Sequence, residues 1–376
     1  MPAPAVRMDR EPWGRLPSGE MVERFTFSAD GGIAFSVATY GATLSSILAP
    51  GHEVPREEVI LGFDHLDGYL SPAYRRANPY FGSTVGRYAN RIRGARLPVD
   101  GSVHALIANE GPNQLHGGSA GFDKAIWAAA PLADGRGVRL SHVSPDGDQG
   151  FPGRLRVEAD FLLEGADTIL LRYRAGADRA THVNLTSHCY FNLGGRSSAT
   201  ALDHDVQIHA EAYLPIDAAA LPTGDCLAVA GTAFDFRQPR GLAAALAAGD
   251  PQLDAGDGFN HTFCIGDDAG TLKPAVRLMH AASGRLLEIS TTEPGVQFYS
   301  GNGLDGSIPD RGGQPIGRHR ALCFETQHFP DSPNMPQFPS TLLRPGKEYR
   351  SETRLRFGTM APEALRPGDG TAGRRA

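Results

Sequence analysis

The chain has 376 residues, and 36 Lys and Arg against 42 Asp and Glu give a formal net charge of −6. This mildly acidic balance argues against nucleic acid or an anionic membrane surface as a partner, because both select basic proteins. The 46 glycines and 28 prolines exceed average usage, yet they stay below the level of disordered low-complexity chains and predict many turns between short strands.

Alternating apolar and polar residues predict the strands, since successive strand side chains point to opposite faces. Residues 33–38 begin this pattern, with Ile33, Phe35 and Val37 on one face. The same period recurs in four later segments, at 155–161, 170–175, 206–212 and 349–357. Each segment is expected to have one buried face and one solvated face, as antiparallel strands commonly do.

Helical signals are scarce, and the strongest is the alanine-rich stretch 241–246. Turn pairs such as Asp100-Gly101 and Asp305-Gly306 separate the strand candidates. Strands without intervening helices predict an all-β fold, a large antiparallel β-sandwich. No repeat or linker-like run interrupts residues 20–357, so we expect a single domain over 1–357 and a mobile tail over 358–376.

The four cysteines, Cys189, Cys226, Cys264 and Cys323, lie far apart and form no C-x-x-C pair. Neither a disulfide framework nor a cysteine zinc site is therefore expected. No apolar run approaches the length of about 18 residues that spans a bilayer. The first residues also lack the apolar centre of a signal peptide, so we expect a cytoplasmic protein.

Two glycine motifs match known functional loops but lack the required context. Residues 117–121 match the G-x-S-x-G pattern of serine hydrolases, which works only on a strand-to-helix turn in an α/β sheet. Residues 301–306 match G-x-G-x-x-G, but no helix is predicted after them to bind a pyrophosphate. Both segments are expected to be loops.

Five groups of segments combine turn residues with polar and aromatic side chains. They are 81–92, 113–118, 184–193, 258–263, and 297–302 paired with 323–328. Sugar hydroxyls need both donors and acceptors, and the C–H faces of a sugar stack on aromatic rings. The Arg, Asn, Gln and aromatic residues of these segments therefore favour a sugar site, with His and Glu available for proton transfer near neutral pH.

The order and content of these segments resemble the aldose 1-epimerase (galactose mutarotase) family from about Gly14 to Phe357. The resemblance is carried by Tyr40-Gly41-Ala42, Asn90-Arg91-Ile92, Asn113 to Gly118, Gly121-Phe122-Asp123-Lys124, Asn184 to Leu193, Gly231 to Phe236, Pro294 to Tyr299, Glu325-Thr326-Gln327 and Leu343 to Gly346. It implies a galactose-mutarotase-like supersandwich, in agreement with the strand pattern. It also implies an isomerase that interconverts the α and β anomers of a free hexose or pentose without a metal or a cofactor.

The resemblance also implies roles for individual residues. Glu325 matches the general base that removes the proton from the C1 hydroxyl, and His188 matches the general acid that protonates the ring oxygen. His116 matches a second histidine that hydrogen-bonds the sugar near the ring oxygen. The implied sugar-binding positions are Asn90, Arg91, Tyr190, Asn260 and Gln297.

Two positions depart from the family pattern. Asn260 stands where the family usually has Asp, and an amide cannot accept hydrogen bonds through both of its terminal atoms. A hydrogen bond to a charged group is worth about 1.5–3 kcal/mol, so Asn260 indicates weaker binding or a different sugar. Ser187, immediately before His188, stands where Asn is more usual.

The proposed roles require opposite protonation states at the two ends of the hemiacetal. A Glu325 carboxylate and a His188 imidazolium meet this requirement at pH 7 only if the site keeps His188 charged. A neighbouring carboxylate would raise the pKa of His188, whereas burial would lower it. The sequence leaves both outcomes open.

Two other functions also stay open. A sugar-binding or sensory relative with weak or no catalysis is suggested by Asn260. An epimerase of a phosphorylated or acidic sugar would need further basic residues at the pocket, and Arg87 and Arg93 are the candidates. In each case the expected partner is a small-molecule monosaccharide, bound by a monomer or homodimer without nucleic acid or membrane.

Overall fold

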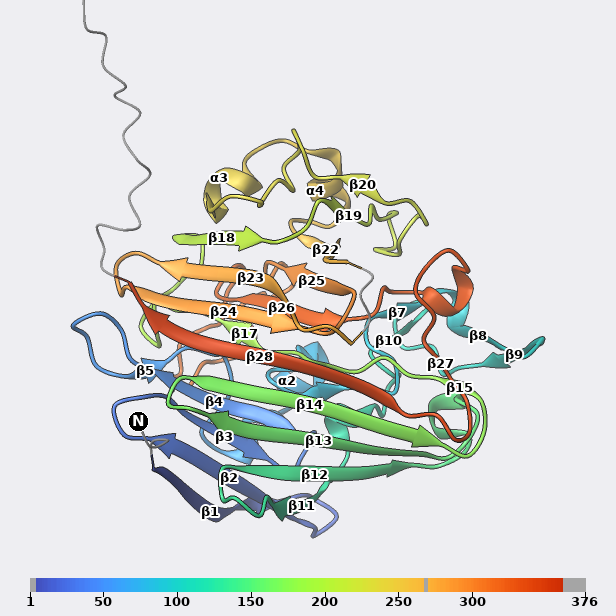
Figure 1. Ribbon diagram of the computed structural model, residues 1–376, viewed down its shortest axis with the longest axis horizontal. Coiled ribbons are helices and arrows are strands. Elements are labelled where there is room, and N and C mark those ends of the chain that lie inside the picture. The colour runs from blue at the N-terminus through green and yellow to red at the C-terminus, as the bar shows by residue number, and fades with distance from the viewer. Residues whose placement is uncertain (1–4, 267–269, 361–376) are drawn as a thin grey trace, which may run out of the picture.

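The computed structural model describes residues 5–266 and 270–360, and the strands in this part pair antiparallel throughout (Figure 1). The largest sheet has nine strands. In spatial order they are β11 (Ala128–Pro131), β12 (Gly137–Ser144), β13 (Leu155–Glu164), β14 (Thr168–Ala177), β28 (Tyr349–Thr359), β24 (Arg285–Thr291), β23 (Lys273–His280), β18 (His204–Ile208) and β21 (Arg240–Gly241).

Two smaller sheets pack behind the nine-stranded one. The five-stranded sheet follows chain order, with β1 (Val6–Arg15), β2 (Met21–Ala29), β3 (Ala34–Ala38), β4 (Thr43–Ala49) and β5 (Glu57–Glu58). The six-stranded sheet has the order β17 (Tyr190–Phe191), β26 (Leu322–Gln327), β25 (Gly295–Tyr299), β22 (Asn260–Cys264), β19 (Ala212–Tyr213) and β20 (Leu227–Ala228).

Short strand pairs and helices complete the described part. The pairs are β6 (Thr84–Val85) with β16 (Thr186–Ser187), β7 (Arg91–Ile92) with β10 (Gln114–Leu115), β8 (Arg96–Val99) with β9 (Ser102–Ala105), and β15 (Thr181–His182) with β27 (Leu342–Leu343). The α-helices are α1 (Leu66–Leu70), α2 (Pro72–Ala77), α3 (Leu242–Leu246) and α4 (Pro251–Ala255), and 3-10 turns cover Arg93–Ala95, Phe122–Lys124, Asp148–Gly150 and Ser332–Asn334. No helix among the described residues is long and apolar enough to cross a membrane.

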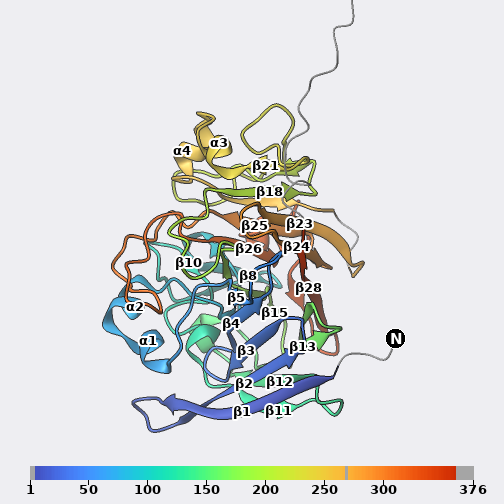
Figure 2. The same cartoon turned by 90° about the vertical axis from the view of Figure 1, so that its left-hand side faces the viewer.

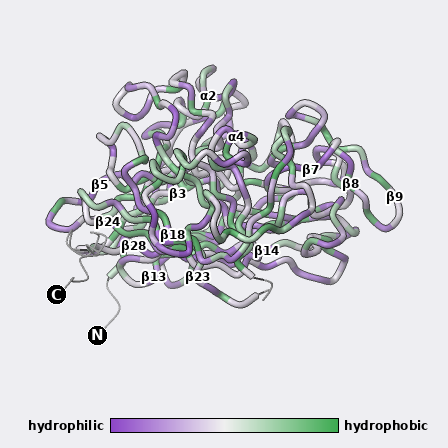
Figure 3. Tube along the Cα trace, turned by 90° about the horizontal axis from the view of Figure 1, so that it is seen from above, coloured by the Kyte–Doolittle hydropathy of each residue, from purple (hydrophilic) through white to green (hydrophobic). Residues whose placement is uncertain are grey.

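The core lies between the nine-stranded sheet and the two smaller sheets. Figure 2 shows the nine-stranded sheet along one side and α1 and α2 on the other. One cluster of buried residues draws from all three sheets, as Phe35 in β3, Phe161 in β13 and Phe298 in β25 illustrate. Seen from above, hydrophilic stretches are common in the peripheral loops (Figure 3).

The predicted all-β sandwich is confirmed, and most predicted elements are present. The strands expected at 33–38, 155–161, 170–175 and 349–357 correspond to β3, β13, β14 and β28, and the helix expected at 241–246 corresponds to α3. Residues 117–121 and 301–306 are loops, as predicted. The four cysteines, all among the described residues, form no disulfide.

The strand predicted over 206–212 is wrong in its second half. β18 ends at Ile208, and β19 begins only at Ala212, in the six-stranded sheet. The partner strand β23 shifts its register against its other neighbour, β24, between Pro274 and Val276. Proline has no N–H for a strand ladder, and a bulge bends the strand, so the pairing of β18 stops there although the apolar alternation continues.

The end of the chain is only partly described. β28 continues through Gly358 to Thr359, beyond the domain end expected at 357. Most of the expected tail, residues 361–376, lies outside the described residues. The single domain and the mobile tail therefore stay predictions.

The register of the six-stranded sheet brings two rows of side chains to one face. One row crosses the strands through Asn260, Tyr299, Cys323 and Tyr190. The next row on the same face, two residues along, holds Thr262, Gln297 and Glu325. Residues two apart share a face of a strand, so these rows form one polar surface while alternate residues such as Phe298 enter the core.

A substitution at Phe298 tests the core packing that supports this polar surface. Its ring stacks on Phe259 and on Phe324, each with centroids 4.9 Å apart. Replacing Phe298 with Ala leaves a cavity in a close-packed core, so we expect a loss of about 3–5 kcal/mol in the free energy of unfolding. Urea denaturation measures this loss. Val143→Ala, at a half-exposed position of β12, is the control and should change stability by about 0.5 kcal/mol or less; similar losses in both variants would contradict the assignment.

Candidate active site

A cavity of about 200 Å³ opens over this polar face of the six-stranded sheet. Seven of the eight predicted site residues line it: Asn90, Arg91, His116, His188, Tyr190, Asn260 and Glu325. They come from segments far apart in the chain, namely β7 and the residue before it, the loop after β10, the turn between β16 and β17, β17 itself, β22 and β26. The eighth predicted residue, Gln297, lies behind Asn260 and does not line the cavity.

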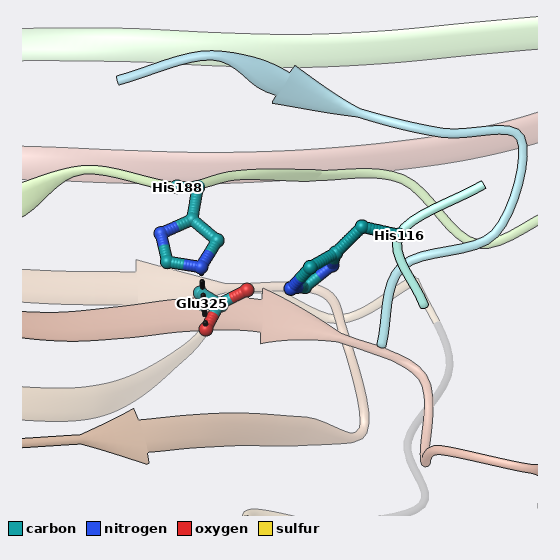
Figure 4. A group of neighbouring side chains, drawn as sticks. All are labelled: His116, His188 and Glu325. Atoms are coloured by element: carbon teal, nitrogen blue, oxygen red, sulfur yellow. Dashed lines mark ion pairs between the residues drawn. The ribbon is translucent and has the colours of Figure 1, made fainter. Parts of the chain in front are cut away.

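The two groups predicted to transfer protons lie next to each other. His188 Nε2 is 3.6 Å from Glu325 Oε1, and the two residues are only 4% and 3% exposed. Figure 4 shows both His188 and His116 turned toward the Glu325 carboxyl group. One ring nitrogen from each histidine and a Glu325 oxygen all lie within 4.8 Å of one another.

Burial shifts the two pKa values in opposite directions. Loss of hydration raises the pKa of Glu325 to about 8, opposed only in part by the charge of Arg91. Loss of hydration lowers the pKa of His188 to about 4. Burial therefore outweighs the neighbouring carboxylate, and at neutral pH the pair favours a protonated Glu325 beside a neutral His188.

The His188 ring is held mainly by packing. It stacks between Tyr190, at 5.1 Å, and Tyr80, at 5.7 Å, with an interplanar angle of 22° to each ring. Its Nδ1 atom lies 3.7 Å from Cys323 Sγ. A thiol is only a weak hydrogen-bond partner, so the rings contribute most to the orientation of this imidazole.

The His116 ring has a fixed proton position. The backbone N–H of Asn90 donates to His116 Nδ1 over 3.1 Å, so in the neutral ring Nε2 carries the proton. Burial, followed by the charges of His188 and Arg91, lowers the pKa of His116 well below its usual value. His116 is therefore a neutral hydrogen-bond donor toward the cavity.

Arg91 lines the cavity and forms an ion pair with Glu110. Its Nε and Nη2 atoms donate to the two carboxylate oxygens of Glu110, each over 2.7 Å. The β7–β10 pairing sets Leu115 opposite Arg91, and the bidentate ion pair fixes the plane of the guanidinium. Arg91 can thus offer its remaining N–H groups to a sugar from a rigid position.

Asn260 and Gln297 form a directed chain of hydrogen bonds. Thr262 Oγ1 donates to Gln297 Oε1 over 2.6 Å, and Gln297 Nε2 donates to Asn260 Oδ1 over 2.9 Å. The acceptor oxygen of Asn260 is therefore occupied, and its NH₂ group is left to face the cavity as a donor. An aspartate here would present a carboxylate oxygen instead.

The two arginines suggested for a phosphorylated or acidic sugar lie elsewhere. Arg87 is buried, and its guanidinium donates to the backbone carbonyls of Pro152 and Gly153. Arg93 forms ion pairs with Asp217 and Asp331. Neither side chain lines the cavity, and a solvated surface position is excluded for Arg87 by its burial.

Some residues of the site were missed by the sequence reasoning. Tyr80 lines the cavity one position before the polar segment 81–92, and Tyr299 lies inside the flagged segment 297–302. Both tyrosines lie in or next to a polar segment, and this placement could have identified them. No pattern in the sequence pointed to Glu110, because its contact with Arg91 depends on the β7–β10 pairing.

His116, His188 and Glu325 are the one group of metal-ligating side chains found close together among the described residues. Neutral imidazoles and a carboxylate are suitable ligands for a divalent ion. The expectation that the reaction needs no metal stays a prediction.

Comparison with known proteins gives a consistent result. The family model for aldose 1-epimerase matches residues 23–356. Galactose mutarotase of Rattus norvegicus is 44% identical over 353 residues, covering 94% of this chain and 99% of the rat protein. Aldose 1-epimerase of Escherichia coli K12 is 38% identical over 343 residues, covering 91% and 96%. The crystal structure of galactose 1-epimerase from Lactobacillus acidophilus NCFM superposes with a TM-score of 0.79 at 29% identity, covering 94% of this chain and 99% of that one. The chain therefore belongs to the aldose 1-epimerase family.

Proposed function

We propose that Glu325 and His188 carry the proton transfers of anomer interconversion, in a pocket that takes one free monosaccharide. The family reaction interconverts the α and β anomers of aldose sugars, so the protein is an isomerase. The observation that supports these two residues is the buried pair itself. A carboxyl group and an imidazole lie 3.6 Å apart. Burial has raised the pKa of Glu325 to about 8 and lowered the pKa of His188 to about 4, so the carboxyl group has the higher value.

Ring opening moves one proton off the sugar and one proton onto it. Glu325, as a carboxylate, takes the proton from the C1 hydroxyl while the C1–O5 bond breaks and C1 becomes a carbonyl. His188, as an imidazolium, gives its proton to O5. Rotation about the C1–C2 bond exposes the other face of the aldehyde, and closure with the two roles reversed forms the other anomer. The pair holds one proton before and one after each step.

The burial of Glu325 and His188 favours proton transfer in the direction of ring opening. Ring opening converts a carboxylate and an imidazolium into two neutral groups, and burial favours the neutral groups for both Glu325 and His188. The open-chain form of the sugar thus coincides with the preferred protonation state of the pair. Closure on either face restores the ion pair, so the arrangement serves both anomers.

Three further residues are suited to bind the sugar. His116 offers its Nε2 proton, and Arg91 offers N–H groups held by Glu110. Asn260 offers its NH₂ group. We propose that these donors bind sugar oxygens, while the ring of Tyr190 lines the same cavity and positions His188.

The size and the charge of the cavity bear on the substrate. A cavity of about 200 Å³ is smaller than a typical drug-sized ligand pocket, in keeping with a single monosaccharide. Among its lining residues Arg91 is the one Lys or Arg, and Glu110 pairs with it. We therefore propose a neutral aldose, with galactose as the first sugar to test because similar proteins are named for it.

The main alternative is a sugar-binding relative with weak catalysis, which Asn260 still motivates. Calorimetry that detects sugar binding, combined with polarimetry that detects no faster mutarotation than buffer, would select it.

We also propose a cytoplasmic monomer or homodimer without nucleic acid or membrane partners. The net charge of −6 is in keeping with this proposal.

Replacing Glu325 with Gln removes the base and keeps the shape of the side chain. We expect kcat for galactose mutarotation to fall by about 10²–10⁴-fold while the sugar still binds, because general-base catalysis contributes about that much. Polarimetry and calorimetry measure the two effects. Glu348→Gln, at an exposed carboxylate outside the cavity, is the matched control. Normal turnover by Glu325→Gln would remove Glu325 from the base role.

The pH dependence follows from the pair. Between pH values of about 4 and about 8 the pair holds the single proton that the reaction needs. Below this range His188 gains a proton while Glu325 keeps its own, so no base is left. Above it Glu325 loses its proton while His188 stays neutral, so no acid is left. We expect a bell-shaped kcat profile with these limbs, measured after subtraction of buffer catalysis; a flat profile from pH 5 to 10 would rule out the pair.

Asn260→Asp tests the donor at the end of the hydrogen-bond chain. An aspartate would accept from sugar hydroxyls with a charge-assisted bond worth about 1.5–3 kcal/mol. We expect KM for the preferred sugar to fall by about tenfold with little change in kcat. Gln238→Glu, at an exposed position outside the cavity, controls for the added charge. Unchanged KM for glucose, galactose, xylose and arabinose would show that position 260 does not contact the sugar.

A further inference from the structure

An ion pair beside the active site has no role in the proton transfers described above. Lys124 Nζ lies 2.6 Å from Asp123 Oδ2, and the two residues end the 3-10 turn Phe122–Lys124. Asp123 is only 5% exposed, and its Oδ1 atom has no hydrogen-bond partner among the described residues. Removing the Asp123 carboxylate from water is costly, whereas the Lys124 side chain is still 31% exposed, so stability alone is weak grounds for this pair.

The ion pair leads directly to Tyr80. Lys124 Nζ lies 5.4 Å from the centroid of the Tyr80 ring, within the range of a cation–π contact. Tyr80 is 7% exposed and has a φ of 60°, a left-handed conformation that is costly for a bulky residue. Surrounding contacts must hold such a residue in place, and Lys124 supplies one of them.

Tyr80 in turn contacts both histidines of the site. Its ring is stacked on His188 with centroids 5.7 Å apart, and it meets His116 at 4.7 Å with an interplanar angle of 62°. The two histidine rings are 5.2 Å apart. The single ring of Tyr80 therefore contacts both imidazoles, so a shift of this ring would affect both.

This contact matters because the side chain that His188 Nδ1 meets, Cys323 with its Sγ 3.7 Å away, is only a weak hydrogen-bond partner. The stacked rings of Tyr80 and Tyr190 therefore contribute to the orientation of His188. The electron-rich face of an aromatic ring also attracts a cation. The stacked tyrosine thus favours the imidazolium that His188 must become when it acts as the acid.

We propose that Asp123 and Lys124 are positioning residues for the epimerase reaction: they hold the Tyr80 ring, which aligns His188 and His116 against Glu325. The proposal rests on the proposed roles of these three residues. Asp123 fixes the Lys124 ammonium, Lys124 fixes Tyr80, and Tyr80 fixes the imidazoles. None of the three needs to exchange a proton with the sugar.

Charged groups face the histidines from several elements. Glu325 lies on β26, Arg91 on β7 with its partner Glu110, and Lys124 on the 3-10 turn with its partner Asp123. Burial, His188, Arg91 and Lys124 all lower the pKa of His116. Removing the Lys124 charge therefore raises the pKa of His116.

The ring is tested with Tyr80→Leu and Tyr80→Phe. We expect kcat to fall by about 3- to 30-fold in Tyr80→Leu, the range of a ring or cation–π contact, with KM changed by less than about threefold. Tyr80→Phe keeps the ring and should stay within about twofold of the wild type. Tyr69→Leu is the control, because this buried ring contacts Trp13 and Phe63 and neither histidine. Equal kcat in Tyr80→Leu and the wild type, or equal damage in Tyr80→Phe, would overturn the proposal.

The ion pair is tested with Lys124→Met and Lys124→Arg. We expect kcat to fall by about 3- to 10-fold in Lys124→Met, with the pKa of His116, followed by NMR titration, raised, and recovery in Lys124→Arg, which keeps the cation. Lys347→Met, at an exposed lysine, is the control. If Lys124→Met does not fold, Asp123→Asn combined with Lys124→Met removes both charges and leaves neither one unpaired. Wild-type kcat and an unchanged His116 titration in the folded variant would overturn the role of the ion pair.

A readout without turnover separates this proposal from the proposed function. Loss of the Tyr80 ring should change the NMR shifts of the Cε1–H groups of His188 and His116 at pH 7, because both imidazoles lie within its ring current. Unchanged shifts would overturn the contact. Normal activity of His188→Asn would instead overturn the proposed function, whatever the shifts show.

Discussion

Desolvation of Glu325 is the constraint on which the rest of the site depends. The residue lies on β26, between β17 and β25, and is only 3% exposed, so its carboxyl group has lost most of its hydration. One of its oxygens, Oε2, has no hydrogen-bond partner among the described residues. Arg91 is the cation that opposes the resulting rise in pKa, and its charge is divided with Glu110. The fold thus holds a carboxyl group that protonates near neutral pH, next to an imidazole that resists protonation.

The register of the six-stranded antiparallel sheet brings Glu325 next to other residues of the cavity. Glu325 and Gln297 share one cross-strand row, while Asn260 and Tyr190 stand at the two ends of the neighbouring row. The base and the sugar contact that we propose at Glu325 and Asn260 therefore lie on adjacent rows of one surface. The nine-stranded sheet supports this surface from behind through the shared core.

The sequence was sufficient for the parts of the molecule that depend on local pattern. Period-2 alternation identified β3, β13, β14 and β28, and motif context identified His188 and Glu325. It failed where the outcome depends on a distant partner. The alternation at 206–212 runs across a change of sheet, and Glu110 meets Arg91 only through a strand pairing. The protonation of His188 could not be decided either, because burial and a nearby carboxylate oppose each other and only the folded structure gives their balance.

The hydrogen-bond chain from Thr262 through Gln297 to Asn260 has an evolutionary consequence. Because each donor is fixed by the one before it, the only group free to change is the last atom of the chain, at position 260. Asparagine and aspartate codons differ by a single base, and the exchange replaces an NH₂ group with an oxygen without altering the shape of the side chain. One point mutation would therefore reverse the hydrogen-bonding character of one wall of the pocket and leave the proposed base, the proposed acid and the backbone in place. If Asn260 contacts the sugar as we propose, sugar preference can change at a single nucleotide without a change in the residues proposed for proton transfer.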